Sequence, residues 1–116
     1  HSCRIVREQR GREPDLYHYE GPLGRVKSFE NPAKARLYAD VQTLVGGFRE
    51  EKSAERGVPP AVARSREDVL MAYLAAQPTM GVEWVARSFD LFEERVRSYI
   101  DMVRERAIER RENDGE

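Results

Sequence analysis

Two side chains near the start of the chain, Cys3 and His18, could supply a nucleophile and its base. A Cys–His pair becomes reactive when a third group orients the imidazole and an oxyanion-binding site faces the sulfur. The sequence shows no such third group, and it has no nucleophile elbow, glycine-rich phosphate loop or metal-ligand spacing. The carboxylates are scattered along helical patterns that are typical of solvated faces. We therefore expect a protein that is not an enzyme and that needs no cofactor or metal.

The composition limits the size and the setting of the protein. With 116 residues, 40% hydrophobic and 35% charged, the chain is the size of one ordinary domain or of two very small ones that share a core. A single cysteine excludes an internal disulfide framework. No apolar run reaches the length that a membrane span needs, and no secretion signal is evident. We expect a cytoplasmic protein without a membrane partner.

Charge is distributed unevenly along the chain, although the net charge is only −1. Residues 1–36 carry eight basic and five acidic side chains, whereas residues 65–116 carry eight basic and twelve acidic ones. Phosphate contacts supply most of the affinity in nucleic-acid binding. A nucleic-acid interface is therefore favoured more by the charge of the first segment than by that of the last.

Basic and aromatic residues are interleaved in the N-terminal segment. They are Arg4, Arg7, Arg10, Arg12, Arg25 and Lys27, with Tyr17, Tyr19 and Phe29. Gly24–Phe29 followed by Pro32–Arg36 resembles the three-strand-plus-helix DNA-binding domains of phage integrases and plant AP2 factors. The resemblance implies four contacts to DNA, from Arg4, Arg7, Arg25 and Lys27. The alternative is that these residues only keep an exposed sheet face soluble.

Three strands and a helix should position those residues. The β-rich runs are Cys3–Gln9, Leu16–Glu20 and Arg25–Phe29. Asn31 is a good N-cap and Pro32 suits the first turn of a helix. That helix presents an apolar stripe of Leu37, Val41, Leu44, Val45 and Phe48. Gly46-Gly47 either weakens it or ends it, and 49–56 could continue the helix or belong to a linker.

Three further helices are predicted after the break at Gly57-Val58-Pro59-Pro60. The first begins with the capping-box-like Ser65-Arg66-Glu67-Asp68 and places Val69, Leu70, Tyr73 and Leu74 on one face. A short helix from Gly81 to Phe89 turns four residues inward: Val82, Val85, Ala86 and Phe89. Asp90 can cap the last helix, from Leu91 to Arg110, whose apolar seam is Val96, Ile100, Val103 and Ala107.

The segment Val82–Ile100 has the steric pattern of two helices that cross closely at a tight turn. Ala86 is the small residue at the contact, and Leu91 fills the turn. Val85 and Phe89 face inward, while Val96 and Ile100 anchor the second helix. This segment resembles the helix-turn-helix superfamily, including its winged-helix members.

The resemblance implies that Leu91–Arg110 enters the major groove of DNA. The implied contacts are Arg87, Arg95, Arg97, Ser98 and Arg104. Two departures from the family pattern stand out. Asp90 occupies the turn position where the family usually has glycine, and Glu93 and Glu94 open the recognition helix, where phosphate would repel them.

Taken together, the sequence predicts an α+β fold: an N-terminal three-stranded antiparallel sheet with a helix, then a C-terminal trihelical helix-turn-helix. We expect a module at 1–56, a linker at 57–64 and a second module at 65–116. The expected function is binding of double-stranded DNA, as a homodimeric transcriptional regulator or a mobile-element accessory protein. The alternative is a non-catalytic protein-interaction or assembly module built on the same trihelical core.

The long last helix leaves one further choice open. Its apolar seam could pair with a second copy of the chain, as in many dimeric regulators. It could equally cover the N-terminal sheet within the same chain.

Overall fold

A three-stranded antiparallel meander forms the first layer of the protein. The computed structural model describes residues 3–48 and 58–114. The strands are β1 (Arg4–Glu8), β2 (Leu16–Gly21) and β3 (Gly24–Phe29), in the order β1-β2-β3. The three predicted strands and the α+β class are therefore confirmed.

The register of the meander decides which side chains face the helices. Tyr17 pairs with Phe29, and Tyr19 pairs with Lys27. Tyr19 and Phe29 are buried in the core, and Tyr17 packs against it. The register shifts next to Tyr19, so that Glu20 pairs with Arg25 and Val26 is the extra residue of a bulge.

Helix α1 (Pro32–Val45) follows directly, and its two ends are set by local chemistry. The Asn31 side chain accepts hydrogen bonds from the backbone N–H groups of Ala33 (2.8 Å) and Lys34 (3.3 Å). Gly46 ends the helix with a φ of 75°, in the left-handed region that glycine adopts most readily. The predicted Asn31 cap is confirmed. Gly46-Gly47 was expected either to weaken the helix or to end it, and the structure shows that the glycines end it. Residues 49–56, for which continuation or linker was predicted, lie outside the described residues.

Four helices follow: α2 (Pro60–Ala63), α3 (Glu67–Ala75), α4 (Val82–Ser88) and α5 (Glu93–Asp114). The predicted capping role of Ser65 is wrong. Its hydroxyl instead donates to the carbonyl oxygen of Ala61 (2.7 Å), because a short helix precedes it. The start of α3 has no side-chain cap from Arg66, and the Asp68 carboxylate accepts from the N–H of Val69 (2.9 Å).

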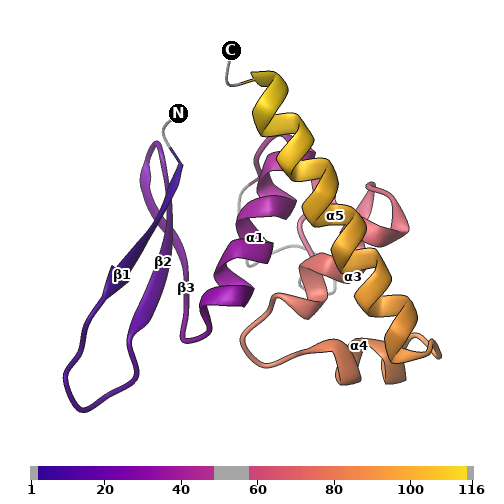
Figure 1. Cartoon of the computed structure of the whole chain (residues 1–116), viewed down its shortest axis with the longest axis horizontal. Helices are drawn as coiled ribbons and strands as arrows, with labels where there is room; N and C mark the ends of the chain where they lie inside the picture. The colour runs from indigo at the N-terminus through magenta and orange to yellow at the C-terminus, as the bar shows by residue number, and fades with distance from the viewer. Residues whose placement is uncertain (1–2, 49–57, 115–116) are drawn as a thin grey trace.

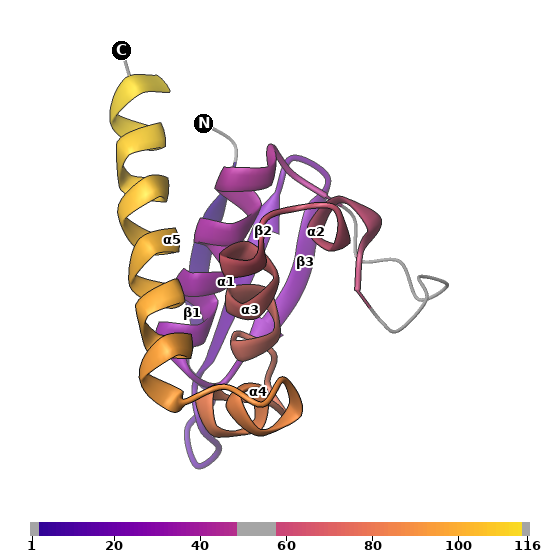
Figure 2. The ribbon, with the colours of Figure 1, turned by 90° about the vertical axis from the view of Figure 1, so that its right-hand side faces the viewer.

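Helix α1 lies between the sheet on one side and α3 and α5 on the other (Figure 1). Turned by 90°, the same layers show α5 running along one side of the molecule, with α4 at one end (Figure 2). One cluster of buried side chains extends from Tyr19 in the sheet to Val103 in α5. Val62 of α2, inside the predicted linker, is buried in that cluster, so the packing includes the described part of the linker, 58–64. Whether the two halves fold independently stays a prediction.

An aromatic contact ties the two halves together, and an ion pair joins two helices of the second half. Tyr38 of α1 is fully buried, with its ring 5.4 Å from that of Tyr19, 5.3 Å from Phe29 and 6.3 Å from Tyr73 of α3. Asp68 of α3 is also buried, and Arg106 of α5 donates to its carboxylate at 2.9 Å. A buried carboxylate needs such a partner, because an unpaired charge in the interior is costly.

The seam of α5 is buried, as predicted, but against a surface that was not foreseen. Val96, Ile100, Val103 and Ala107 are all buried within one chain. Helix α5 packs on α1 and α3, with α1 separating it from most of the sheet. The seam therefore neither covers the sheet nor remains open for a second copy.

The Asn31 cap gives a first testable prediction. Replacing Asn31 by alanine removes the acceptor for two N–H groups and should cost about 1 kcal/mol of stability. Asn31→Asp keeps the acceptor and should retain most of the stability. Urea unfolding of both variants measures the difference, and equal losses would contradict the capping role.

Candidate nucleic-acid interface

The turn between α4 and α5 is closed by a backbone bond that requires a left-handed residue. Asp90 has a φ of 55°, and the N–H of Leu91 donates to the carbonyl oxygen of Ala86 at 2.8 Å. This is the Schellman arrangement, in which the left-handed position is usually glycine. Asp90 therefore takes the conformation expected of that glycine. It does not cap the last helix as predicted, because α5 begins at Glu93 rather than at Leu91.

The inward-facing residues of this region are only partly as predicted. Val85 and Ala86 are buried, and Val96 and Ile100 of α5 are buried opposite them. Phe89 was expected to face inward but is 41% exposed, because α4 ends at Ser88 and Phe89 begins the turn. Phe92, the last residue before α5, is 86% exposed.

Three of the predicted contact residues lie on the exposed surface of the first two turns of α5. They are Arg95, Arg97 and Ser98. Arg97 forms an ion pair with Glu93 at 3.3 Å. Arg95 lies over the Tyr99 ring, 6.0 Å from its centroid, and the Tyr99 hydroxyl donates to Glu67 of α3 at 2.6 Å. A weak hydrogen bond to Tyr99 raises the pKa of Arg95 above its ordinary value, so the guanidinium stays charged.

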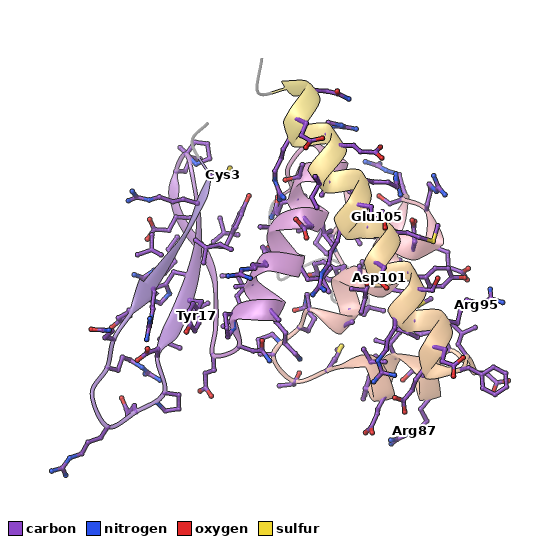
Figure 3. The ribbon with its side chains drawn as sticks, in the orientation of Figure 1. Cys3, Tyr17, Arg87, Arg95, Asp101 and Glu105 are labelled. Carbon is purple, nitrogen blue, oxygen red and sulfur yellow. The ribbon has the colours of Figure 1, made fainter. Side chains whose placement is uncertain are left out.

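Arg87 of α4 is exposed at the same end of the molecule as Arg95 (Figure 3). Arg104 is exposed too, but farther along α5. Arg104 lies seven residues beyond Arg97, about 10 Å along the helix, and lines a groove beside α1 and β1. Acidic residues are interspersed here, because Asp101 and Glu105 are exposed on the same helix (Figure 3). The predicted set on α5 therefore divides into two places.

The predicted sheet contacts do not form one surface. Arg4 and Arg25 both flank Glu20 on the face turned away from the helices, and Arg4 pairs with Glu20 at 3.3 Å. Lys27 pairs with Tyr19, so it points to the helix side. Arg7 also points there, opposite Tyr17, and is held by Asp15 at 2.6 Å, which raises the pKa of its guanidinium. The face expected from the integrase and AP2 resemblance is thus split between two sides of the sheet.

A polar network on the outer face of the sheet was missed by the sequence reasoning. His18 is 1% exposed and uses both ring nitrogens: Nδ1 lies 2.6 Å from the Ser28 hydroxyl and Nε2 lies 2.7 Å from the Glu8 carboxylate. Cys3 points to the opposite face, near the Tyr19 hydroxyl, so the considered Cys–His pair does not form. Only the strand register reveals this network, since it places residues 18 and 28 opposite each other.

The network also has an electrostatic signature. Hydrogen bonding by His18 holds the pKa of Glu8 below its ordinary value of 4.5, so the carboxylate is ionised and accepts from Nε2–H. The other ring nitrogen, Nδ1, is hydrogen-bonded to the Ser28 hydroxyl. The order carboxylate, imidazole, hydroxyl is that of a hydrolase triad, but a triad also needs an oxyanion site. We interpret the network as cross-strand support for the meander.

Burial shifts the pKa values of three other groups, Lys34, Tyr19 and Asp40. Burial lowers the pKa of Lys34, whose ammonium group donates to the carbonyl oxygens of Gln77 and Met80 and so joins α1 to the loop after α3. Burial raises the pKa of the Tyr19 hydroxyl. It also raises the pKa of Asp40, against the opposing effect of Arg111, which lies 2.8 Å away.

Comparisons with known protein families, with curated proteins and with solved structures found no match. Within residues 3–48 and 58–114, no group of three or more histidine, cysteine or acidic side chains is arranged to hold a metal ion. None of the described helices is long and apolar enough to cross a membrane.

The left-handed turn makes a prediction about Asp90. Asp90→Gly should be neutral or stabilising, because glycine has no Cβ to strain at this φ. Asp90→Ala should cost about 1 kcal/mol, because alanine keeps the Cβ and lacks the short polar side chain that lets aspartate adopt this conformation. Chemical denaturation of the two variants tests the difference. Equal stability of the glycine and alanine variants would show that the turn does not hold Asp90 in this conformation.

The Glu8 carboxylate makes a prediction about pH. A carboxyl group whose pKa is lower in the folded state than in the unfolded state stabilises the fold when the pH lies above the pKa of the unfolded state. This contribution to stability is lost as the pH falls through the pKa of the folded state. Glu8→Gln should therefore lower the Tm at pH 7, and the deficit should shrink as the pH falls below 4.5. Glu30→Gln, at an exposed residue, is the matched control and should show no such trend. A deficit independent of pH would contradict the assignment.

Proposed function

We propose that this protein binds double-stranded DNA with α4 and the first turns of α5, as a helix-turn-helix protein. The observation that carries the proposal is the closed turn at Asp90, which is followed by a helix whose outer surface is free of other described elements. A protruding helix of this kind suits the major groove, which is wide enough to admit it. Arg87, Arg95, Arg97 and Ser98 are the proposed contacts.

The basic residues of this surface can exchange their present partners for phosphate at small cost. The Arg97–Glu93 pair is solvent-exposed, and exposed pairs contribute about 0–1 kcal/mol. Arg95 is held by a long hydrogen bond to Tyr99, by stacking on the Tyr99 ring and by the charge of Glu67. Glu93 and Glu94 repel phosphate at the start of α5. The affinity should therefore come from the individual guanidinium groups, which contact particular base edges and the phosphates nearest to them.

The biological setting is proposed with the same function. Such a protein would act in the cytoplasm as a homodimeric transcriptional regulator or as an accessory protein of a mobile element. A dimer would place two α5 helices in successive major grooves. Since the α5 seam is buried within the chain, the dimer contact would use another surface.

A second candidate function, protein interaction, is favoured by one specific observation. The exposed surface of α5 carries Glu94, Asp101 and Glu105, and the exposed ring of Phe92 lies just before the helix. An aromatic side chain with an acidic surround suits a basic protein partner.

Fluorescence anisotropy with random and genomic duplexes, measured over a range of salt concentrations, tests the proposal. Affinity should fall steeply with salt, and each of Arg95→Ala and Arg97→Ala should reduce the slope of log affinity against log salt by about 1. Arg12→Ala, in the exposed loop between β1 and β2, is the control and should leave binding unchanged. No duplex affinity even at the lowest salt would refute DNA binding and leave the protein-interaction candidate.

A further inference from the structure

The exposed aromatic side chains of the protein are gathered in one short segment, 84–92. Trp84 and Phe89 are each 41% exposed, and Phe92 is 86% exposed. Every other phenylalanine and tyrosine in 3–48 and 58–114 is buried or half-buried. Phenylalanine is among the residues that are most often fully buried in folded proteins. The ring of Phe92 is therefore the strongest indication of a contact with another molecule in this part of the protein.

The backbone on both sides of Phe92 is held in place. The N–H of Leu91 donates to the carbonyl oxygen of Ala86 across the left-handed turn, and the Leu91 side chain packs against the core. The carbonyl oxygen of Phe92 accepts from the N–H groups of Arg95 (3.0 Å) and Val96 (3.4 Å), which are the first hydrogen bonds of α5. The ring therefore stands at the N-terminal tip of α5, at a position that the turn fixes.

The position of the ring limits what it can read in DNA. The N-terminal residues of a recognition helix are the ones that contact base edges in the major groove. A phenyl ring has no conventional hydrogen-bonding group, so it cannot pair with the donors and acceptors of those edges. The apolar group that the bases present in this groove is the C5-methyl group of thymine. The modified base 5-methylcytosine carries a methyl group at the same ring position.

We propose that Phe92 reads the C5-methyl group of a pyrimidine in the major groove and thereby sets a base preference of the DNA site. This inference rests on the proposed function, because it assigns a role within the same interface. Glu93 and Glu94 favour an apolar contact at this point: they weaken the attraction of phosphate but do not oppose the burial of a methyl group against a ring. The guanidinium groups then supply salt-dependent affinity, and Phe92 supplies a preference that does not depend on salt.

The test measures the anisotropy of random-sequence duplexes with the full chain, using pools that differ only in pyrimidine methyl groups. The first pool contains thymine, the second contains uracil instead, and the third contains uracil together with 5-methylcytosine in place of cytosine. Loss of the methyl group should weaken binding about fourfold, the effect of burying one methyl-sized group, and 5-methylcytosine should restore it. The ratio of affinities for the first two pools should stay constant while both affinities fall with added salt.

Variants locate the methyl contact on Phe92. Phe92→Ala should bind the thymine and uracil pools equally, because the ring that distinguishes them is gone, whereas Phe92→Leu keeps an apolar side chain and should retain part of the preference. Leu23→Ala is the matched control. Leu23 is 94% exposed, but the turn between β2 and β3 that carries it lies at the other end of the molecule from the start of α5 (Figure 1). The control should change neither the affinity nor the ratio, and circular dichroism confirms that each variant is folded.

The outcomes separate this inference from the function on which it rests. Duplex binding with equal affinity for the thymine and uracil pools would overturn the role of Phe92 and leave DNA binding intact. A preference for thymine that persists in Phe92→Ala, or that is lost equally in Leu23→Ala, would overturn it too. A preference for thymine without restoration by 5-methylcytosine would support the role of Phe92 and confine the contact to thymine. The absence of duplex binding would overturn the proposed function and this inference together.

Discussion

Packing around the ring of Tyr38 is the constraint on which the rest of the structure depends. This fully buried side chain contacts rings from the sheet and from α3, so it joins layers that come from the first and second halves of the sequence. Aromatic pairs in edge or tilted geometry add stability beyond the area that they bury. Because the ring fixes α1 between the two layers, it also fixes where α5 lies relative to the β1 edge.

The elements could be predicted from the sequence where local chemistry determines them. The strands, the Asn31 cap and the buried faces of α4 and α5 follow from period, turn residues and capping side chains. Ser65 was assigned wrongly because the short helix before it has no sequence signal beyond Pro60. Phe89 was assigned wrongly because one residue decides whether a side chain ends a helix or begins a turn.

The arrangement of charged groups could not be predicted, because it depends on register and on packing between distant segments. Sequence spacing grouped Arg4, Arg7, Arg25 and Lys27, yet strand alternation puts them on two faces. The Glu8–His18–Ser28 network and the groove beside Arg104 each combine residues from different elements. The helical pattern of the sequence indicates that Arg95 and Arg97 are exposed. It cannot indicate which acidic side chains of other elements lie beside them.

The length of α5 has a mechanical consequence. Its 22 residues extend about 33 Å as one continuous rod, held along its middle by α1 and α3. Its first turns carry the exposed arginines, and its last turns form one wall of the groove. The exposed arginines at one end of the rod and the groove-lining residues at the other are therefore kept at a set spacing and orientation, without any flexible linker between them.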